Sequence, residues 1–186
     1  MPIAHPMTAD EFLARPETRR SLREELIAGE LVVHEPLPLH QIVTGDILGA
    51  LMLWTREAPQ RGLAILPLDV QLDDRNVYAP DVLWYAEGRA PGRDGGRPSP
   101  VPDIAVEVRS PSTWRDDVRT KKAVYERRGL PELWLVDTVA ECVLVFRRSN
   151  PPAARFDVTV EFGRAATLTS PLLPGFALAI ADLFGD

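Results

Sequence analysis

Hydrophobic and polar positions repeat with different periods along this chain, and each period predicts an element. Apolar residues at helical spacing predict one long amphipathic helix over residues 39–57. Before it, two apolar stretches on either side of an Ala-Gly pair predict a tight strand-turn-strand over residues 25–33. Near the start, Thr8 followed three residues later by Glu11 is a capping signal, which predicts a short first helix.

The middle and the end of the chain favour strands. We expect β-type runs over residues 64–72, 82–85, 104–108, 133–136 and 143–147. The Gly-, Pro- and Arg-rich segment 88–102 predicts a surface loop without a binding role, because no Gly-Lys-Ser/Thr follows its glycines. Capping residues over 110–113 precede a predicted helix over 116–128 that stops at Gly129. Short strand-like pieces and a brief helical turn complete residues 156–186.

Length and composition indicate one globular domain. The 186 residues, 45% of them hydrophobic and 26% charged, suffice for one compact domain over residues 1–186. The longest apolar run, residues 48–54, is far shorter than the roughly 20 residues that span a bilayer, so we expect no membrane segment. Because the N-terminus shows no export signal, we expect a cytoplasmic protein.

Charge and cysteine content exclude some classes of function. The net charge of −6 argues against a protein that coats nucleic acid. It leaves a nuclease open, because a bound metal cancels the charge of acidic catalytic residues. The single cysteine, Cys142, excludes an internal disulfide and a thiolate zinc site, and its apolar surroundings predict a packed thiol.

Two acidic residues lie where buried strands are expected. Asp81 stands at the start of the run 82–85, and Glu107 lies inside the run 104–108. A buried carboxylate costs several kcal/mol unless it meets a cation, a metal or a proton. Strand alternation puts Glu107 and Arg109 on one face, and Asp81 on a neighbouring strand can approach Glu107. Two such carboxylates suit a bridging Mg²⁺ or Mn²⁺ and not zinc.

The helix after Glu107 adds a candidate cation. Lys121 and Tyr125 are four residues apart, which places them on one helical face. A lysine that reaches Glu107 would stabilise the negative charge that develops on a cleaved phosphodiester. Lys122 offers the alternative register, and we favour Lys121.

Several motifs follow one another in an order that is specific as a whole. They are ELIAGEL (25–31), His40 at a helix start, Pro80 with Asp81, PDIAVEVRSPST (102–113), Lys121 with Tyr125, GLPELWLVD (129–137) and LPGF (173–176). This order resembles the Uma-type family of restriction endonucleases, which belongs to the PD-(D/E)XK nuclease superfamily. The resemblance covers about residues 8–184.

The resemblance implies an α/β (α+β) fold with a restriction-endonuclease-like core. In it, helices flank a central mixed β-sheet, with an N-terminal hairpin and a C-terminal strand extension. It also implies a metal-dependent phosphodiesterase site, with Asp81 and Glu107 as metal ligands and Glu25 as a third, often water-mediated ligand. The superfamily lysine normally stands where this chain has Arg109, which is a poor base. Lys121 matches the members whose lysine has moved onto the following helix.

Each assignment has a structural alternative. Asp81 could be a turn cap, and Glu107 could form an ion pair with Arg109 or Lys121. Glu25 could form a salt bridge that Glu24 or Glu30 could equally make. His40 could support the metal site or contact a phosphate, or it could be a helix cap or a packing residue. Tyr125 and Arg109 complete the set of supporting candidates.

The leading hypothesis is a Mg²⁺- or Mn²⁺-dependent endonuclease that hydrolyses phosphodiester bonds in nucleic acid, with DNA as the expected substrate. The alternative is a nuclease fold with little or no cleavage that binds nucleic acid or regulates. The acidic pI of about 5.1 and the absence of a recognisable reading domain favour this alternative. The segment 115–128, with six basic and three acidic side chains, could dock a phosphate backbone or form a solvated helix face. A third hypothesis is a structural homodimer whose charged residues form an ion-pair network, with residues 133–146 or the C-terminal segment as its interface.

Overall fold

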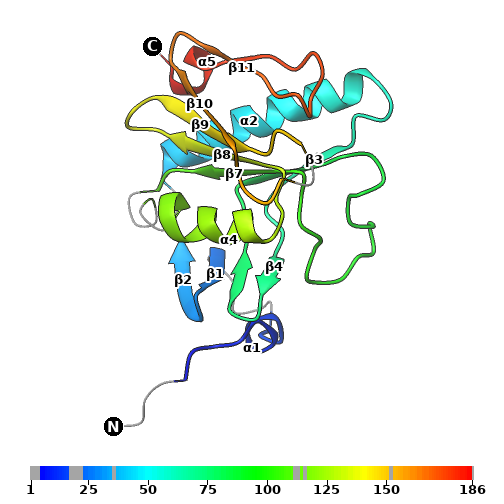
Figure 1. Cartoon of the computed structure of the whole chain (residues 1–186), viewed down its shortest axis with the longest axis vertical. Helices are drawn as coiled ribbons and strands as arrows, with labels where there is room; N and C mark the ends of the chain where they lie inside the picture. The colour runs from blue at the N-terminus through cyan, green and yellow to red at the C-terminus, as the bar shows by residue number, and fades with distance from the viewer. Residues whose placement is uncertain are drawn as a thin grey trace.

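The computed structural model describes residues 5–16, 23–34, 37–110, 114, 117–150 and 153–185. Within these ranges the strands form a six-stranded, a four-stranded and a two-stranded sheet. Figure 1 shows helix α2 (Pro38–Glu57) and the C-terminal segment on one side of the six-stranded sheet. Helix α4 (Lys122–Arg127) and the four-stranded sheet lie on the other side.

The N-terminal elements confirm the sequence prediction. Helix α1 (Ala9–Leu13) begins with the predicted capping box, in which the Thr8 hydroxyl accepts from the Glu11 amide and Glu11 accepts from the Thr8 amide. Strands β1 (Arg23–Ile27) and β2 (Glu30–His34) form the predicted antiparallel hairpin. Ala28 and Gly29, at φ 53° and 84°, supply the left-handed backbone that a two-residue hairpin turn requires.

The six-stranded sheet is mixed, as expected. In spatial order it consists of β10 (Val158–Gly163), β9 (Cys142–Arg147), β8 (Glu132–Asp137), β7 (Ile104–Val108), β6 (Val82–Tyr85) and β3 (Leu63–Ile65). Strands β7 and β8 pair in parallel, and the other neighbours pair antiparallel. All residues of β8 are buried, so this part of the segment 133–146 contributes its side chains to the core. Cys142 is buried, as predicted.

One predicted strand is wrong. The run 64–72 divides into β3 and β4 (Val70–Asp73), which belong to different sheets. Pro67 lies between them and has no amide hydrogen for a continuous ladder. Strand β4 pairs with β5 (Asn76–Tyr78), which the sequence analysis did not predict, and the four-stranded sheet has the order β2-β1-β5-β4.

The helix predicted over 116–128 is regular only in its second half. Residues Asp117–Lys121 form a π-helical segment, η2, and α4 continues from Lys122. Hydrophobic spacing cannot locate such a turn, because it adds one residue to a helix that otherwise repeats every 3.6 residues. Gly129, at φ 80°, ends the helix as predicted. Residues 111–113 and 116, which include the predicted capping residues, lie outside the described residues.

The remaining segments agree with the sequence. Residues 88–102 form a loop with one isolated bridge, from Ser99 to Val70. The C-terminal segment carries the short strands β11 (Thr167–Leu168) and β12 (Leu178–Ala179) and the helical turn α5 (Ala181–Phe184). None of the helices in the described ranges combines the length and the hydropathy that crossing a membrane requires.

Strand alternation sends the side chains of the large sheet into two cores. Val82 and Val106 pack with α2 on one face, whereas Leu83 and Ala105 pack with Tyr125 on the other. Asp81 and Glu107 alternate with the two valines, so both project toward the α4 face. Strand alternation alone therefore places both acids on the α4 face of the sheet.

Helix α2 offers a test of this packing with a matched pair of leucines. Leu51 is completely buried against the sheet, whereas Leu53 is 70% exposed. We expect Leu51→Ala to lower the free energy of unfolding by about 2–5 kcal/mol, because it leaves a cavity. Leu53→Ala should change it by less than about 0.5 kcal/mol. Urea unfolding measures both, and equal effects would contradict this arrangement.

Candidate active site

The pairing of β6 with β7 brings the two candidate metal ligands near each other. Val82 pairs with Val106 in the antiparallel ladder, and Asp81 directly precedes Val82. The Asp81 amide donates to the Val106 carbonyl over 2.8 Å and its carboxylate accepts from the Val108 amide, so Asp81 contacts the residues on either side of Glu107. Both side chains are about 2% exposed. The register brings together two acids that are 26 positions apart in the chain.

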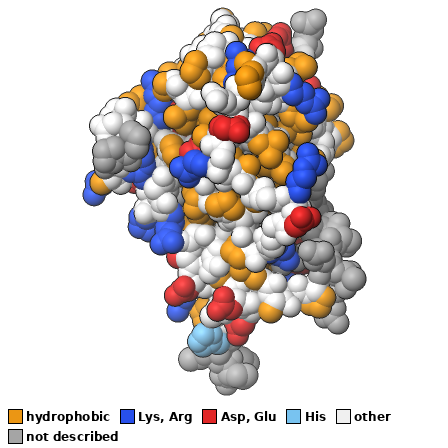
Figure 2. Space-filling view, turned by 90° about the vertical axis from the view of Figure 1, so that its right-hand side faces the viewer, with side chains coloured by type: hydrophobic (Ala, Val, Ile, Leu, Met, Phe, Trp, Pro, Cys, Tyr) orange, Lys and Arg blue, Asp and Glu red, His pale blue; other side chains and the backbone are white. Residues whose placement is uncertain are grey.

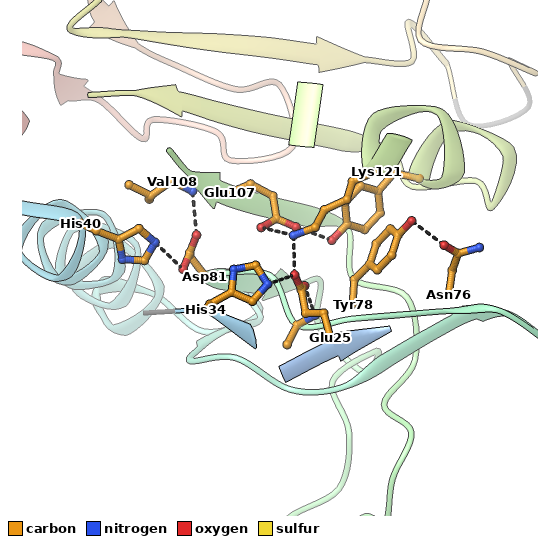
Figure 3. Close-up of polar contacts among 11 residues, drawn as sticks. Glu25, His34, His40, Asn76, Tyr78, Asp81, Glu107, Val108 and Lys121 are labelled. Atoms are coloured by element: carbon orange, nitrogen blue, oxygen red, sulfur yellow. Dashed lines mark hydrogen bonds and ion pairs between the residues drawn. The ribbon is translucent and has the colours of Figure 1, made fainter. Parts of the chain in front are cut away.

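Asp81 is held by two donors. Its Oδ2 accepts a 2.7 Å hydrogen bond from the Val108 amide, and its Oδ1 lies 3.1 Å from His40 Nε2 (Figure 3). His40 lies in the first turn of α2, so the beginning of this helix contacts Asp81. Because an ionised carboxylate only accepts hydrogen bonds, His40 acts as the donor. His40 thus orients Asp81.

Glu107 is held from the following helix. Its Oε1 accepts a 2.8 Å hydrogen bond from the Tyr125 hydroxyl, and its Oε2 lies 3.3 Å from Lys121 Nζ. Burial, together with the charge of Glu107, raises the pKa of Tyr125 well above its usual value. The hydroxyl therefore keeps its proton and remains a donor. Both residues of the helix face that the sequence singled out meet the same carboxylate.

Lys121 lies at the centre of a buried polar cluster that also contains Glu25, His34, His40, Tyr78, Asp81, Glu107 and Tyr125. Its Nζ is 2.7 Å from Glu25 Oε2 and 5.6 Å from the centre of the Tyr78 ring, and the residue is only 1% exposed. Lys122 instead places its Nζ 4.6 Å from the ring centre of Phe146. Of the two lysines, Lys121 therefore faces the acids.

Glu25 is turned toward Lys121. It is fully buried in β1, and its Oε1 accepts a 2.7 Å hydrogen bond from the Ala79 amide. The alternative Glu24 forms an ion pair with Arg15 at 2.8 Å. Across the described ranges, no three or more His, Cys, Asp or Glu side chains gather in a group that could hold a metal ion. The contacts of Glu25 are thus those of a partner for an ammonium.

Arg109 is directed away from Glu107. Its guanidinium donates a 2.7 Å hydrogen bond to Asp137 at the end of β8 and lies 5.2 Å from the centre of the Trp114 ring. Burial opposes ionisation of Asp137, but hydrogen bonds from the Ala140 amide and Arg109 outweigh it and lower the pKa of Asp137. The position two residues after Glu107 therefore serves an ion pair at the rim of the sheet.

Two side chains of the cluster, His34 and Tyr78, are not predicted from the sequence. His34 Nε2 lies 2.6 Å from Glu25 Oε2, and Tyr78 sits on the unpredicted strand β5 beside Lys121. The pairing register of the hairpin would have predicted the position of His34. Glu25 pairs with Val32, so alternation places His34 on the face of Glu25 once this register is known.

The donor set fits a hard divalent cation. The cluster holds the carboxylates of Glu25, Asp81 and Glu107 and the single ammonium of Lys121. With the carboxylates ionised and the two histidines neutral, two negative charges are in excess. Buried excess charge is costly, and one divalent cation would cancel it. Mg²⁺ prefers oxygen ligands, commonly binds through one or two carboxylates, and keeps several waters. Asp81 and Glu107 would be the protein ligands of such an ion.

Comparison with known proteins places the chain in a family. The family model described as "Uma2: Putative restriction endonuclease" matches residues 9–181. The chain belongs to the Uma2 family. This match confirms the resemblance seen in the order of the motifs, and it supports a nuclease.

A solved structure supports the same fold for this Uma2 protein. It is described as "a putative nuclease belonging to DUF820 from Anabaena variabilis ATCC 29413". It is similar to this chain with a TM-score of 0.77 and 25% sequence identity, over 96% of this chain and 98% of that one. A search of curated proteins found none that matches. The predicted mixed sheet flanked by helices is confirmed.

The two neighbouring lysines of this Uma2 protein provide a stability test. Lys121→Met would leave Glu25 and Glu107 buried without their shared cation, so we expect the free energy of unfolding to fall by about 3–5 kcal/mol. Lys122→Met, which removes only a contact with aromatic rings, should cost about 1 kcal/mol or less. Urea unfolding of the metal-free protein measures both variants. A smaller loss for Lys121→Met than for Lys122→Met would show that the cluster does not depend on its lysine.

Proposed function

We propose that this Uma2 protein is a metal-dependent endonuclease of the PD-(D/E)XK type that hydrolyses phosphodiester bonds in DNA. One observation carries the proposal. Asp81 contacts the residues on either side of Glu107 through its amide and its carboxylate, and Lys121 contacts Glu107. Two carboxylates beside a lysine match the charge requirements of phosphodiester cleavage, which needs a hard cation and stabilisation of a developing negative charge.

Asp81 and Glu107 would hold Mg²⁺ or Mn²⁺. When bound, the ion supplies Lewis acidity toward a phosphoryl oxygen. The residues behind the two acids fix their orientation: His40 holds one oxygen of Asp81, and Tyr125 holds one oxygen of Glu107. Such supporting hydrogen bonds are important for metal affinity, because they set the direction of the ligand oxygens.

Lys121 would act through its charge. Its ammonium is fixed between two carboxylates and is almost completely removed from water, so its field on a neighbouring phosphate is weakly screened. A phosphoryl group next to Glu107 would lie near this ammonium. Lys121 would thereby stabilise the negative charge that develops as the phosphodiester bond breaks.

Basic side chains on the surface support a nucleic acid as substrate. Arg119, Arg127 and Arg128 are exposed on the helix that carries Lys121, although the whole chain is acidic. Figure 2, which faces the side with β3 and the 88–102 loop, also shows Lys and Arg side chains on both sides of an apolar centre. Local arginines of this kind neutralise backbone phosphates.

A second function is favoured by the burial of the site. Asp81, Glu107 and Lys121 are at most 2% exposed, so a phosphodiester reaches them only if the surroundings move. This observation favours a nuclease fold that binds nucleic acid or regulates without turnover. Incubation with DNA and metal separates the two functions, because a protein that only binds or regulates would bind DNA and leave it intact at every metal concentration.

Cleavage of supercoiled plasmid tests the proposal directly. We expect nicking with Mg²⁺ or Mn²⁺, no nicking with a chelator, and a loss of at least about 100-fold for Glu107→Gln and for Asp81→Asn. Asp46→Asn, which changes an exposed acid on α2, is the matched control and should cleave like the unchanged protein. RNA of similar length, incubated in parallel, tests the choice of DNA.

Calorimetry with Mn²⁺ tests the metal site without relying on cleavage. We expect one saturable site that Asp81→Asn abolishes and Asp46→Asn retains. Binding that survives Asp81→Asn would reject Asp81 as a ligand. Nicking that survives Glu107→Gln would reject the assignment of the active site.

A further inference from the structure

We propose that His34 is a positioning residue that holds Lys121 through Glu25. In this proposal Glu25 fixes the position of the Lys121 ammonium, and Asp81 and Glu107 would bind the metal. The inference rests on the proposed function and adds to it the device that keeps the lysine in place. It comes from three contacts to a single buried carboxylate in the N-terminal hairpin.

The hairpin brings His34 to Glu25. Glu25 of β1 stands opposite Val32 of β2, and His34 follows two residues later on the same face. His34 Nε2 lies 2.6 Å from Glu25 Oε2, and Figure 3 shows the ring and Lys121 both directed at this carboxylate. Both side chains of the pair are nearly inaccessible, at 9% and 0% exposed. A contact so short and so buried is part of the architecture of the site.

Two contacts on different oxygens hold the Glu25 carboxylate. The Ala79 amide, just after β5, donates to Oε1 over 2.7 Å, and His34 Nε2 of β2 lies 2.6 Å from Oε2. Because these contacts come from different segments and reach different oxygens, together they fix the plane of the carboxylate. A fixed acceptor in turn specifies where the ammonium of Lys121 lies.

The distances assign Lys121 to Glu25 more than to Glu107. Lys121 Nζ is 2.7 Å from Glu25 but 3.3 Å from Glu107. The rings of Tyr78 and Tyr125 meet edge to face, with centres 5.4 Å apart, and Tyr78 lies beside the ammonium. Glu107 takes its closer hydrogen bond from the Tyr125 hydroxyl. The ammonium of Lys121 is therefore held mainly by Glu25 of the hairpin and also contacts Glu107, the acid that would hold the metal.

The contacts of Glu25 also make it a poorer metal ligand than Glu107. The ammonium of Lys121 lies 2.7 Å from Glu25 but 3.3 Å from Glu107, so a metal ion at Glu25 would have to displace or crowd the closer cation. Like charges at this distance repel strongly in a buried site. The positioning role therefore predicts that Glu25→Gln leaves metal affinity unchanged, whereas a ligand role predicts that it weakens metal affinity.

Nuclear magnetic resonance of the metal-free protein tests the positioning role directly. With ¹⁵N-labelled lysine, a buried ammonium gives a protected signal, which Lys121→Met identifies by its absence. His34→Gln keeps an N–H donor near the position of Nε2, whereas His34→Leu removes it. We expect the signal to survive in His34→Gln, and its hydrogen exchange to accelerate at least about 10-fold in His34→Leu.

Val33→Thr provides the matched control, because Val33 is the neighbour of His34 on β2 and is 42% exposed. It should leave the protected signal unchanged. An unchanged signal in His34→Leu would overturn the proposal. So would equal acceleration in His34→Gln and His34→Leu, because a merely structural role of the ring volume would not distinguish these two variants by their donor.

Metal binding and cleavage complete the test. In His34→Leu we expect kcat to fall about 10-fold, while KM and the Mn²⁺ Kd stay within about 3-fold of the original values. Glu25→Gln should likewise keep its Mn²⁺ affinity. A Mn²⁺ Kd at least about 10-fold weaker in Glu25→Gln would assign Glu25 to the metal and overturn the proposal. If the unchanged protein cleaves nothing, the proposed function fails, and the lysine signal still decides the role of His34.

Discussion

A lysine ammonium shared by two buried carboxylates joins parts of the chain that belong to separate sheets. Glu25 lies in the four-stranded sheet, Glu107 in the six-stranded sheet, and Lys121 in the helical segment that follows β7. Burial makes each of these charges costly by itself, so each depends on the others being in place. The position of the N-terminal hairpin against the large sheet is therefore coupled to the chemistry of the site.

The same coupling explains how the acids are oriented. Backbone amides of Val108, in β7, and of Ala79, just after β5, hold one oxygen each of Asp81 and Glu25. His40 and Tyr125 add donors from helices on opposite faces of the large sheet. The site is thus assembled from rigid elements, and its excess negative charge is what a divalent cation would neutralise.

Local patterns predicted most of the fold because they depend on interactions between near neighbours. The capping box at Thr8, the hairpin turn at Gly29 and the helix end at Gly129 need only a few residues to form. The prediction failed at 64–72, where Pro67 divides a run whose halves pair in different sheets, and at the π-helical turn before α4. In both places the pairing partner or the packing of a neighbouring element decides the structure.

Local sequence specified which residue types are available to the site and on which face of their own element they lie. Alternation placed Glu107 on one face of its strand, and helical spacing aligned Lys121 with Tyr125. Packing between distant elements specified which faces meet: it directed Arg109 to Asp137, turned Glu25 toward Lys121 and placed His34 behind Glu25. A buried charge takes whichever partner the packing of distant strands brings within contact distance, and local sequence does not encode that distance.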